Sequence, residues 1–211
     1  MKATLWNEGW TFWTDRDPAP APVTLPHDAM MCSARRADAA GGDAMGYFDG
    51  DVYRYEKRFQ APKGPGTDCV QLRFDGVYRN ATVSLNGVEL ARHAYGYTPF
   101  TVDLAPALIR DGENVLTVVA DNSKLPCSRW YSGGGIYRDV WLLSANERHI
   151  PWQGVRVDTL STDPARIRVR MELAGEQQDG DLSAALTVSI EILDGTGVLA
   201  CAEGCDVELE L

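Results

Sequence analysis

The chain has 211 residues, enough for one large β domain or for two unequal domains. It carries 20 Lys and Arg against 30 Asp and Glu, a net charge of -10 that would repel phosphate backbones and anionic lipid headgroups. The charge weighs against nucleic acid and membrane partners, and no uninterrupted apolar stretch reaches the roughly 18 residues that span a bilayer.

The cysteines and the amino terminus favour a reducing compartment. An odd number of cysteines at irregular spacing, without a C-x-x-C pair, predicts free thiols rather than zinc or dithiol chemistry. These cysteines are Cys32, Cys69, Cys127, Cys201 and Cys205. No apolar run of signal-peptide length follows Met1 and Lys2. With Met1 as the native start, we expect a cytoplasmic protein.

Three tryptophans open the chain at helical spacing, namely Trp6, Trp10 and Trp13. Gly9 interrupts this pattern, and three prolines follow it closely, so a helix is disfavoured. We predict an extended segment that places the tryptophans in the core.

Short alternating runs bounded by Gly, Pro, Asn and Asp then predict β-strands. They cover residues 52–59, 70–75, 81–85, 88–90, 114–120 and 136–143. Asn86-Gly87 is typical of a type I′ hairpin turn. Leu104–Ile109, with Pro106 near its start, predicts one short turn of helix. Many short strands separated by turn clusters predict an all-β sandwich or jelly roll.

The composition changes near residues 145–151, which predicts a jelly-roll domain at 1–146 and a second domain at 147–211. Further strands are predicted at 155–158, 165–173, 186–193 and 207–211. This tail is short of the roughly 100 residues and seven strands of an immunoglobulin-like sandwich. We therefore expect an incomplete second domain, an amino-terminal fragment of a longer protein, and an exposed strand edge that favours homo-oligomers.

The segment from Ser128 to Leu142 packs aromatic residues, arginines and three glycines between two apolar strands. Glycines at 133–135 let the backbone take positive φ and turn tightly. Trp130 and Tyr131 offer flat faces with polar edges, of the kind that pack on sugars or on another domain.

This loop resembles the end of the amino-terminal domain of glycoside hydrolase family 2, the family of β-galactosidases, β-glucuronidases and β-mannosidases. Other segments are similar to the family's motifs in the same order. Val23–Asp28 resembles its "LPHDW" motif, with Ala29 in place of Trp. Residues 53–59 resemble its "GxxWYRKxF" strand, and residues 74–87 resemble its "FDGVYxxAxVxxNG" segment.

The resemblance implies a galactose-binding-like jelly roll, then an immunoglobulin-like domain, of which only part is present, and then a catalytic (β/α)8 barrel. In that family two barrel glutamates perform retaining hydrolysis. The barrel's βα pattern is absent from this chain, so we expect no catalytic residue here. We also expect no metal or other cofactor in this segment, while those of the barrel stay open.

Five residues are candidates for the rim of the sugar pocket or for contact with the barrel. They are Arg129, Trp130, Tyr131, Asp121 and Asn122. The alternative for Arg129 and Trp130 is local packing of an arginine on an aromatic ring. For Asp121 and Asn122 it is an Asx turn that ends a strand. Ser128 stands where some β-galactosidases of the family have a substrate-binding acid.

Three further patterns are better explained by structure than by chemistry. His27-Asp28 lacks a nucleophile elbow, so a buried structural pair is expected. The cluster of Asp43, Asp49 and Asp51 could bind a cation, but a solvated loop is the simpler interpretation. The glycines at 133–135 precede no helix, which argues against a phosphate cradle.

We therefore expect the non-catalytic amino-terminal part of a retaining exo-glycosidase, with β-galactosidase favoured over β-glucuronidase. Its partners would be its own barrel and, through the parent enzyme, a carbohydrate substrate. The rival hypothesis is a free-standing carbohydrate-binding module. The unfinished second domain, the lack of a secretion signal and the lack of an aromatic platform outside the glycine loop weigh against that rival.

Overall fold

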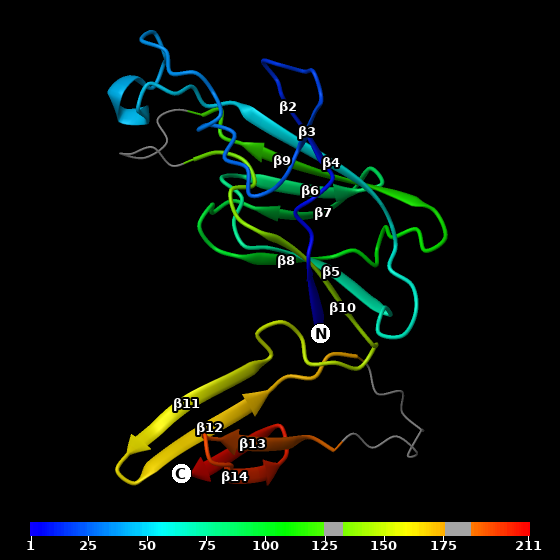
Figure 1. Cartoon of the computed structure of the whole chain (residues 1–211), viewed down its shortest axis with the longest axis vertical. Helices are drawn as coiled ribbons and strands as arrows, with labels where there is room; N and C mark the ends of the chain where they lie inside the picture. Colours follow the sequence, from blue (N-terminus) through cyan, green and yellow to red (C-terminus); the bar gives the residue numbers. More distant parts are fainter. Residues whose placement is uncertain (125–132, 176–186) are drawn as a thin grey trace. The chain divides into compact units, whose positions relative to one another are not determined.

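The computed structural model describes residues 1–124, 133–175 and 187–211. Arg129, Trp130 and Tyr131, as well as Cys127, lie outside the described residues. The chain divides into two compact units, residues 2–144 and residues 145–211, with Met1 grouped with the second. Each unit is built from strands (Figure 1), and the all-β prediction is confirmed. No helix among the described residues is long and apolar enough to cross a membrane.

The first unit is a sandwich of two sheets. One has the order β1(Lys2–Leu5), β10(Val140–Ala145), β5(Cys69–Phe74), β8(Phe100–Asp103). The other has the order β3(Ala21–Val23), β2(Trp10–Thr14), β4(Val52–Gln60), β9(Glu113–Asp121), β6(Ala81–Leu85), β7(Val88–His93). Both sheets contribute to one core, with Leu72 and Phe74 from the first and Tyr55, Val83 and Leu116 from the second.

Strand alternation explains why these segments form a sandwich. Along β9, the residues at every second position from Asn114 to Ala120 are buried, and their neighbours face outward. Between β6 and β7, Asn86 and Gly87 have φ values of 52° and 83°, both positive, as a type I′ turn requires.

The opening tryptophans are extended, as predicted, but only Trp10 is fully buried. Trp6 packs at its rim, edge-to-face on Trp10 at 5.8 Å between ring centroids. The Lys57 ammonium lies 4.2 Å from the centre of the Trp6 ring and donates to the carbonyls of Trp6 and Glu8. Burial lowers the pKa of Lys57 to about 8. This cluster fastens the amino-terminal segment to β4.

Two local predictions were wrong. The segment Leu104–Ile109 forms a hydrogen-bonded turn instead of a helix, and Ile136 precedes β10, which begins at Val140. The helical element that the structure describes is η1(Gly42–Met45), a 3₁₀ turn followed by Gly46 at φ 60°. Its sequence lies in the glycine-rich stretch that predicted only a loop.

The second unit has a three-stranded sheet, in the order β11(Val155–Thr162), β12(Ala165–Met171), β15(Asp206–Glu210). A hairpin of β13(Ser189–Leu193) and β14(Val198–Glu203) packs on it. Among the described residues, Val169, Ile190 and Leu209 form the buried hydrophobic cluster of this unit. Val157 pairs with the buried Val169, yet it is 58% exposed. In the described part of this unit, most residues of β11 are exposed. The sequence analysis missed β14.

Candidate functional site

The three glycines lie where the chain must approach the core closely. Gly133 and Gly135 have φ values of 81° and 87°, which favour glycine. A Cβ at Gly134 would overlap the Tyr53 ring, and one at Gly135 would overlap the Tyr55 hydroxyl. Close packing therefore requires glycine here, and it fixes the carboxyl-terminal flank of the segment that carries Trp130.

The segment around His27 and Asp28 is joined to these glycines by hydrogen bonds. The backbone of Ala29 donates to the carbonyl of Gly134 at 2.8 Å. The Asp28 carboxylate accepts from the backbone amides of Met30, Met31 and Gly134 at 3.1–3.2 Å. These bonds give the Asp28 side chain a structural role.

The His27 side chain lies among aromatic residues. Its Nδ1 is 3.0 Å from the Tyr55 hydroxyl, and its ring meets that of Phe12 edge-on at 4.6 Å between centroids. Burial lowers the pKa of His27 and raises that of Tyr55. A neutral imidazole therefore bridges β4 and the amino-terminal segment, and its role is structural as well.

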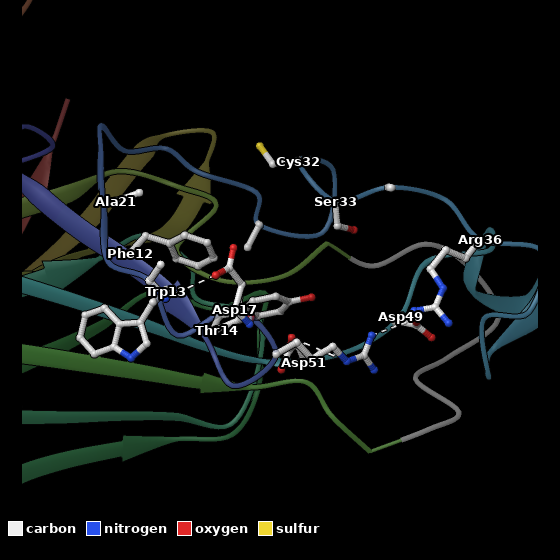
Figure 2. Close-up of a pocket in the computed structure, with 15 residues that line it drawn as sticks. Phe12, Trp13, Thr14, Asp17, Ala21, Cys32, Ser33, Arg36, Asp49 and Asp51 are labelled. Carbon is white, nitrogen blue, oxygen red and sulfur yellow. Dashed lines mark hydrogen bonds and ion pairs between the residues drawn. The ribbon is translucent and has the colours of Figure 1, made fainter.

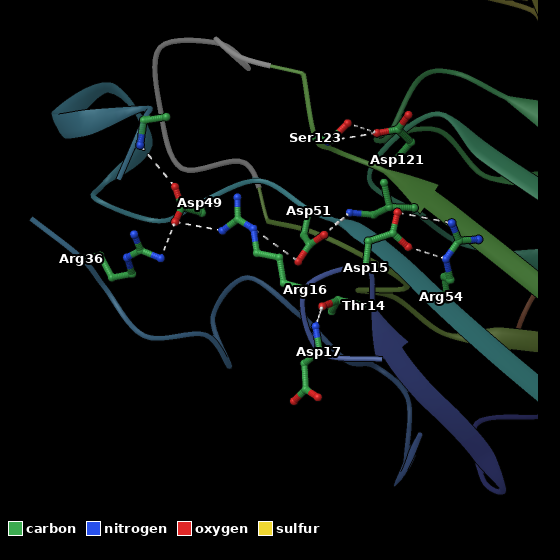
Figure 3. Close-up of polar contacts among 12 residues, drawn as sticks. Thr14, Asp15, Arg16, Asp17, Arg36, Asp49, Asp51, Arg54, Asp121 and Ser123 are labelled. Carbon is green, nitrogen blue, oxygen red and sulfur yellow. Dashed lines mark hydrogen bonds and ion pairs between the residues drawn. The ribbon is translucent and has the colours of Figure 1, made fainter. Parts of the chain in front are cut away.

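Asp121 and Asn122, two of the predicted site residues, lie at the end of β9 beside the same glycines. The Asp121 carboxylate accepts from the Ser123 amide at 3.0 Å and from its hydroxyl at 2.6 Å, in an Asx turn (Figure 3). These hydrogen bonds hold the pKa of Asp121 below its ordinary value.

Asn122 is fully buried and joins three segments. Its backbone amide donates to the carbonyl of Asp51, and its Nδ2 donates to the carbonyl of Gly133 at 3.3 Å. Its Oδ1 has no hydrogen-bond partner among the described residues. Both described flanks of the segment with Arg129, Trp130 and Tyr131 are thus fixed, at Asn122 and at Gly133.

A pocket of about 400 Å³ lies beside this junction, between β2, the start of β4 and the segment after Ala29 (Figure 2). Its aromatic lining residues are Phe12, Trp13 and Tyr53. Arg36 and Asp49 lie at the opposite end from Phe12. The side chain of Trp13 points away from these polar groups.

The polar end of the pocket is a charge network (Figure 3). Arg16 lies 2.9 Å from Asp49 and 3.9 Å from Asp51, and Arg36 lies 3.5 Å from Asp49. The two carboxylates are only 13% and 12% exposed. The guanidinium groups of Arg16 and Arg36 balance the charges of Asp49 and Asp51. The two carboxylates are therefore neither simply solvated nor dependent on a bound cation.

Asp43, the third member of the predicted acidic cluster, lies on η1, where its carboxylate accepts from the Ala44 amide. Within the described part of the chain, no three His, Cys, Asp or Glu side chains gather as metal ligands would. The sequence analysis missed Arg16 and Arg36, which stand in loops without any periodic pattern.

Residues 42–129 match a family model described as the glycosyl hydrolase 2 galactose-binding domain-like. A beta-galactosidase, BoGH2A of Bacteroides ovatus, is 38% identical over 177 residues, which cover 83% of this chain and 20% of that protein. A putative beta-glucuronidase of Formosa agariphila is 30% identical over 177 residues, which cover 83% and 16%. The chain thus spans about a fifth of the length of these curated relatives.

Solved structures agree with this assignment. A beta-glycosidase from Bacteroides vulgatus superposes with a TM-score of 0.85 at 25% identity, over 100% of this chain and 29% of that chain. A glycosyl hydrolase family 2 member from Bacteroides cellulosilyticus superposes with a TM-score of 0.78 at 27% identity, over 99% and 30%. These matches confirm the resemblance and place the chain in glycoside hydrolase family 2, of which it carries the amino-terminal galactose-binding-like domain.

Proposed function

We propose that the chain is the non-catalytic amino-terminal part of a retaining β-galactosidase, in which it supports a catalytic barrel and shapes the rim of the sugar pocket. The observation that carries the choice of sugar is the similarity to the Bacteroides ovatus beta-galactosidase, 38% identical against 30% for the putative beta-glucuronidase.

The described carboxylates near the glycines support a non-catalytic role. A retaining mechanism needs two carboxyl groups about 5–5.5 Å apart on either side of the scissile bond. Asp49 and Asp51 are held by arginines, and Asp28 and Asp121 accept hydrogen bonds from backbone amides. These groups are committed to the fold.

The supporting role follows from the fixed flanks at Asn122 and Gly133. Fixed ends limit the length of chain that must be ordered when the segment contacts the barrel or the sugar. Arg129, Trp130 and Tyr131 are the residues that this anchoring would offer to the barrel or to the sugar.

The test compares the 211-residue chain with the full product of its natural reading frame on nitrophenyl β-galactoside and β-glucuronide. We expect hydrolysis of the galactoside by the longer protein alone. Preference for the glucuronide would refute the proposed sugar, and hydrolysis by the 211-residue chain would refute the non-catalytic role. In the longer protein, Trp130→Ala should lower kcat/KM for the glycoside that the enzyme cleaves.

A further inference from the structure

Four tyrosines from separate parts of the sequence gather on the first unit: Tyr78, Tyr95, Tyr97 and Tyr137. We call this group the tyrosine platform. The ring of Tyr97 lies 5.4 Å from that of Tyr78 and 5.5 Å from that of Tyr95, between centroids. The Tyr137 hydroxyl donates to the carbonyl of Gly96 at 2.8 Å, which joins it to the loop between β7 and β8.

The platform has a buried base and an exposed top. Tyr78 is 5% exposed, whereas Tyr97 is 44% and Tyr95 is 60% exposed. Tyr78 exchanges two backbone hydrogen bonds with Gly135, at 2.9 Å and 2.7 Å. A Cβ at Gly96 would overlap the Tyr78 ring, so the backbone between the two exposed tyrosines rests on that ring. The backbone that carries the exposed rings is therefore held against a buried base.

The geometry of the exposed rings suits a sugar. Their planes meet at 68°, so they form a corner with one ring face and one ring edge. A pyranose ring has an apolar face of C–H groups that packs on an aromatic face, while its hydroxyls need polar partners at the edge. The phenol hydroxyls are such partners. Arg138 lies beside the platform, 5.1 Å from the centre of the Tyr137 ring.

The size of the patch favours a small ligand over a protein. A whole tyrosine contributes about 150–250 Å², so the two partly exposed rings offer roughly 200 Å². A stable protein interface needs about 800 Å² from each partner. The net charge of -10 further disfavours polyanionic glycans.

We propose that the tyrosine platform binds a pyranose unit of a neutral oligosaccharide, with Tyr95 and Tyr97 as the stacking residues. The platform corrects the expectation that aromatic side chains gather only in the glycine loop. That expectation failed because residues up to 59 positions apart, from Tyr78 to Tyr137, meet only after folding. The proposal does not depend on which glycoside the parent enzyme cleaves.

The test is a titration of the 211-residue chain with lactose and with β-1,4-galactobiose, followed by amide chemical shifts in NMR. We expect saturable shifts at residues 95–97, and at least about a tenfold loss of affinity in Tyr95→Ala and Tyr97→Ala, which equals about 1.4 kcal/mol. Tyr95→Phe should retain most of the binding, because stacking uses the ring face.

Tyr47→Ala is the matched control, since Tyr47 is 44% exposed, like Tyr97, but has no part in the platform. It should leave the affinity unchanged, and the thermal midpoint of each variant shows whether it is folded. The absence of saturable shifts, or equal affinity in Tyr95→Ala, would overturn the proposal. The proposal would also be overturned if the chain binds no sugar but self-associates, and if Tyr95→Ala removes that self-association. A negative result in this titration would not change the expected result of the hydrolysis assay on the parent enzyme.

Discussion

The two units of the chain hold their strands together in different ways. The first has a large core with aromatic residues from both sheets, such as Trp10, Tyr55 and Phe74. Among the described residues, the second has a small buried hydrophobic cluster, formed by Val169, Ile190 and Leu209. Ion pairs such as Arg168–Asp206 and Arg170–Asp158 lie on its surface. Buried apolar area stabilises a fold far more than exposed ion pairs do. The first unit should therefore be the more stable of the two.

The largest expected effect on stability comes from replacing one buried residue in the core of each unit with alanine. Leu116→Ala should lower the free energy of unfolding of the first unit by about 2–5 kcal/mol and leave it folded. Val169→Ala should unfold the second unit altogether while the amide signals of the first unit persist. Urea titration followed by NMR measures both. Equal tolerance of the two substitutions would contradict the comparison.

The next effect concerns the close approach at Gly135. Gly135→Ala should destabilise the first unit by about 2–4 kcal/mol, because the new methyl group overlaps the Tyr55 hydroxyl and φ is positive. Gly87→Ala is the control, since its φ is also positive but nothing lies within 4 Å of its Cβ. It should cost about 1 kcal/mol. If the two substitutions lower the free energy of unfolding equally in a denaturant titration, the structure around residue 135 relaxes to accommodate the methyl group.

A smaller effect is the pH dependence of the stability of the first unit, which contains His27. Because burial lowers the pKa of His27 in the folded state, the unfolded chain binds a proton first as the pH falls through 6.5. The stability of the first unit should fall below that pH and level off below the folded-state pKa. His27→Gln should flatten this profile in thermal melts. A variant that loses stability below pH 6.5 as steeply as the parent chain would contradict the assignment.

The smallest effect lies on the surface of the second unit. Arg168→Ala removes the partner of Asp206 across β12 and β15, and its effect on stability should be slight. Added salt should shrink the difference between the variant and the parent chain, because salt screens exposed charges. A thermal melt at two ionic strengths measures it. A large loss that persists at high salt would show that the pair organises the unit.

Strands were predictable where buried and outward-facing residues alternate over many positions, whereas β14 was missed. The alternation along β4 and β9 and the Asn86-Gly87 turn identify their elements directly. The helix expected at Leu104–Ile109 fails for a reason that lies elsewhere in the chain. The fully buried Asn114 side chain binds both the amide and the carbonyl of Ile109, at 2.8 Å each, so these groups have partners without a helix.

The candidate site was predictable only in part. The glycines, Asp121 and Asn122 are marked by local sequence, because tight turns and strand ends demand particular residue types. Arg16, Arg36 and Asp49 come together over 33 residues, and no local pattern carries such a contact. Arg129, Trp130 and Tyr131 lie outside the described residues, and their role stays a prediction.

The two fixed flanks at Asn122 and Gly133 have a consequence for how such a domain can diversify. Because both flanks are bonded to the core, we expect substitutions at residues 125–132 to leave the sandwich folded. Chimeras that keep residues 121–124 and Gly133–Gly135 and exchange residues 125–132 among relatives would then vary what the domain presents while its scaffold stays the same.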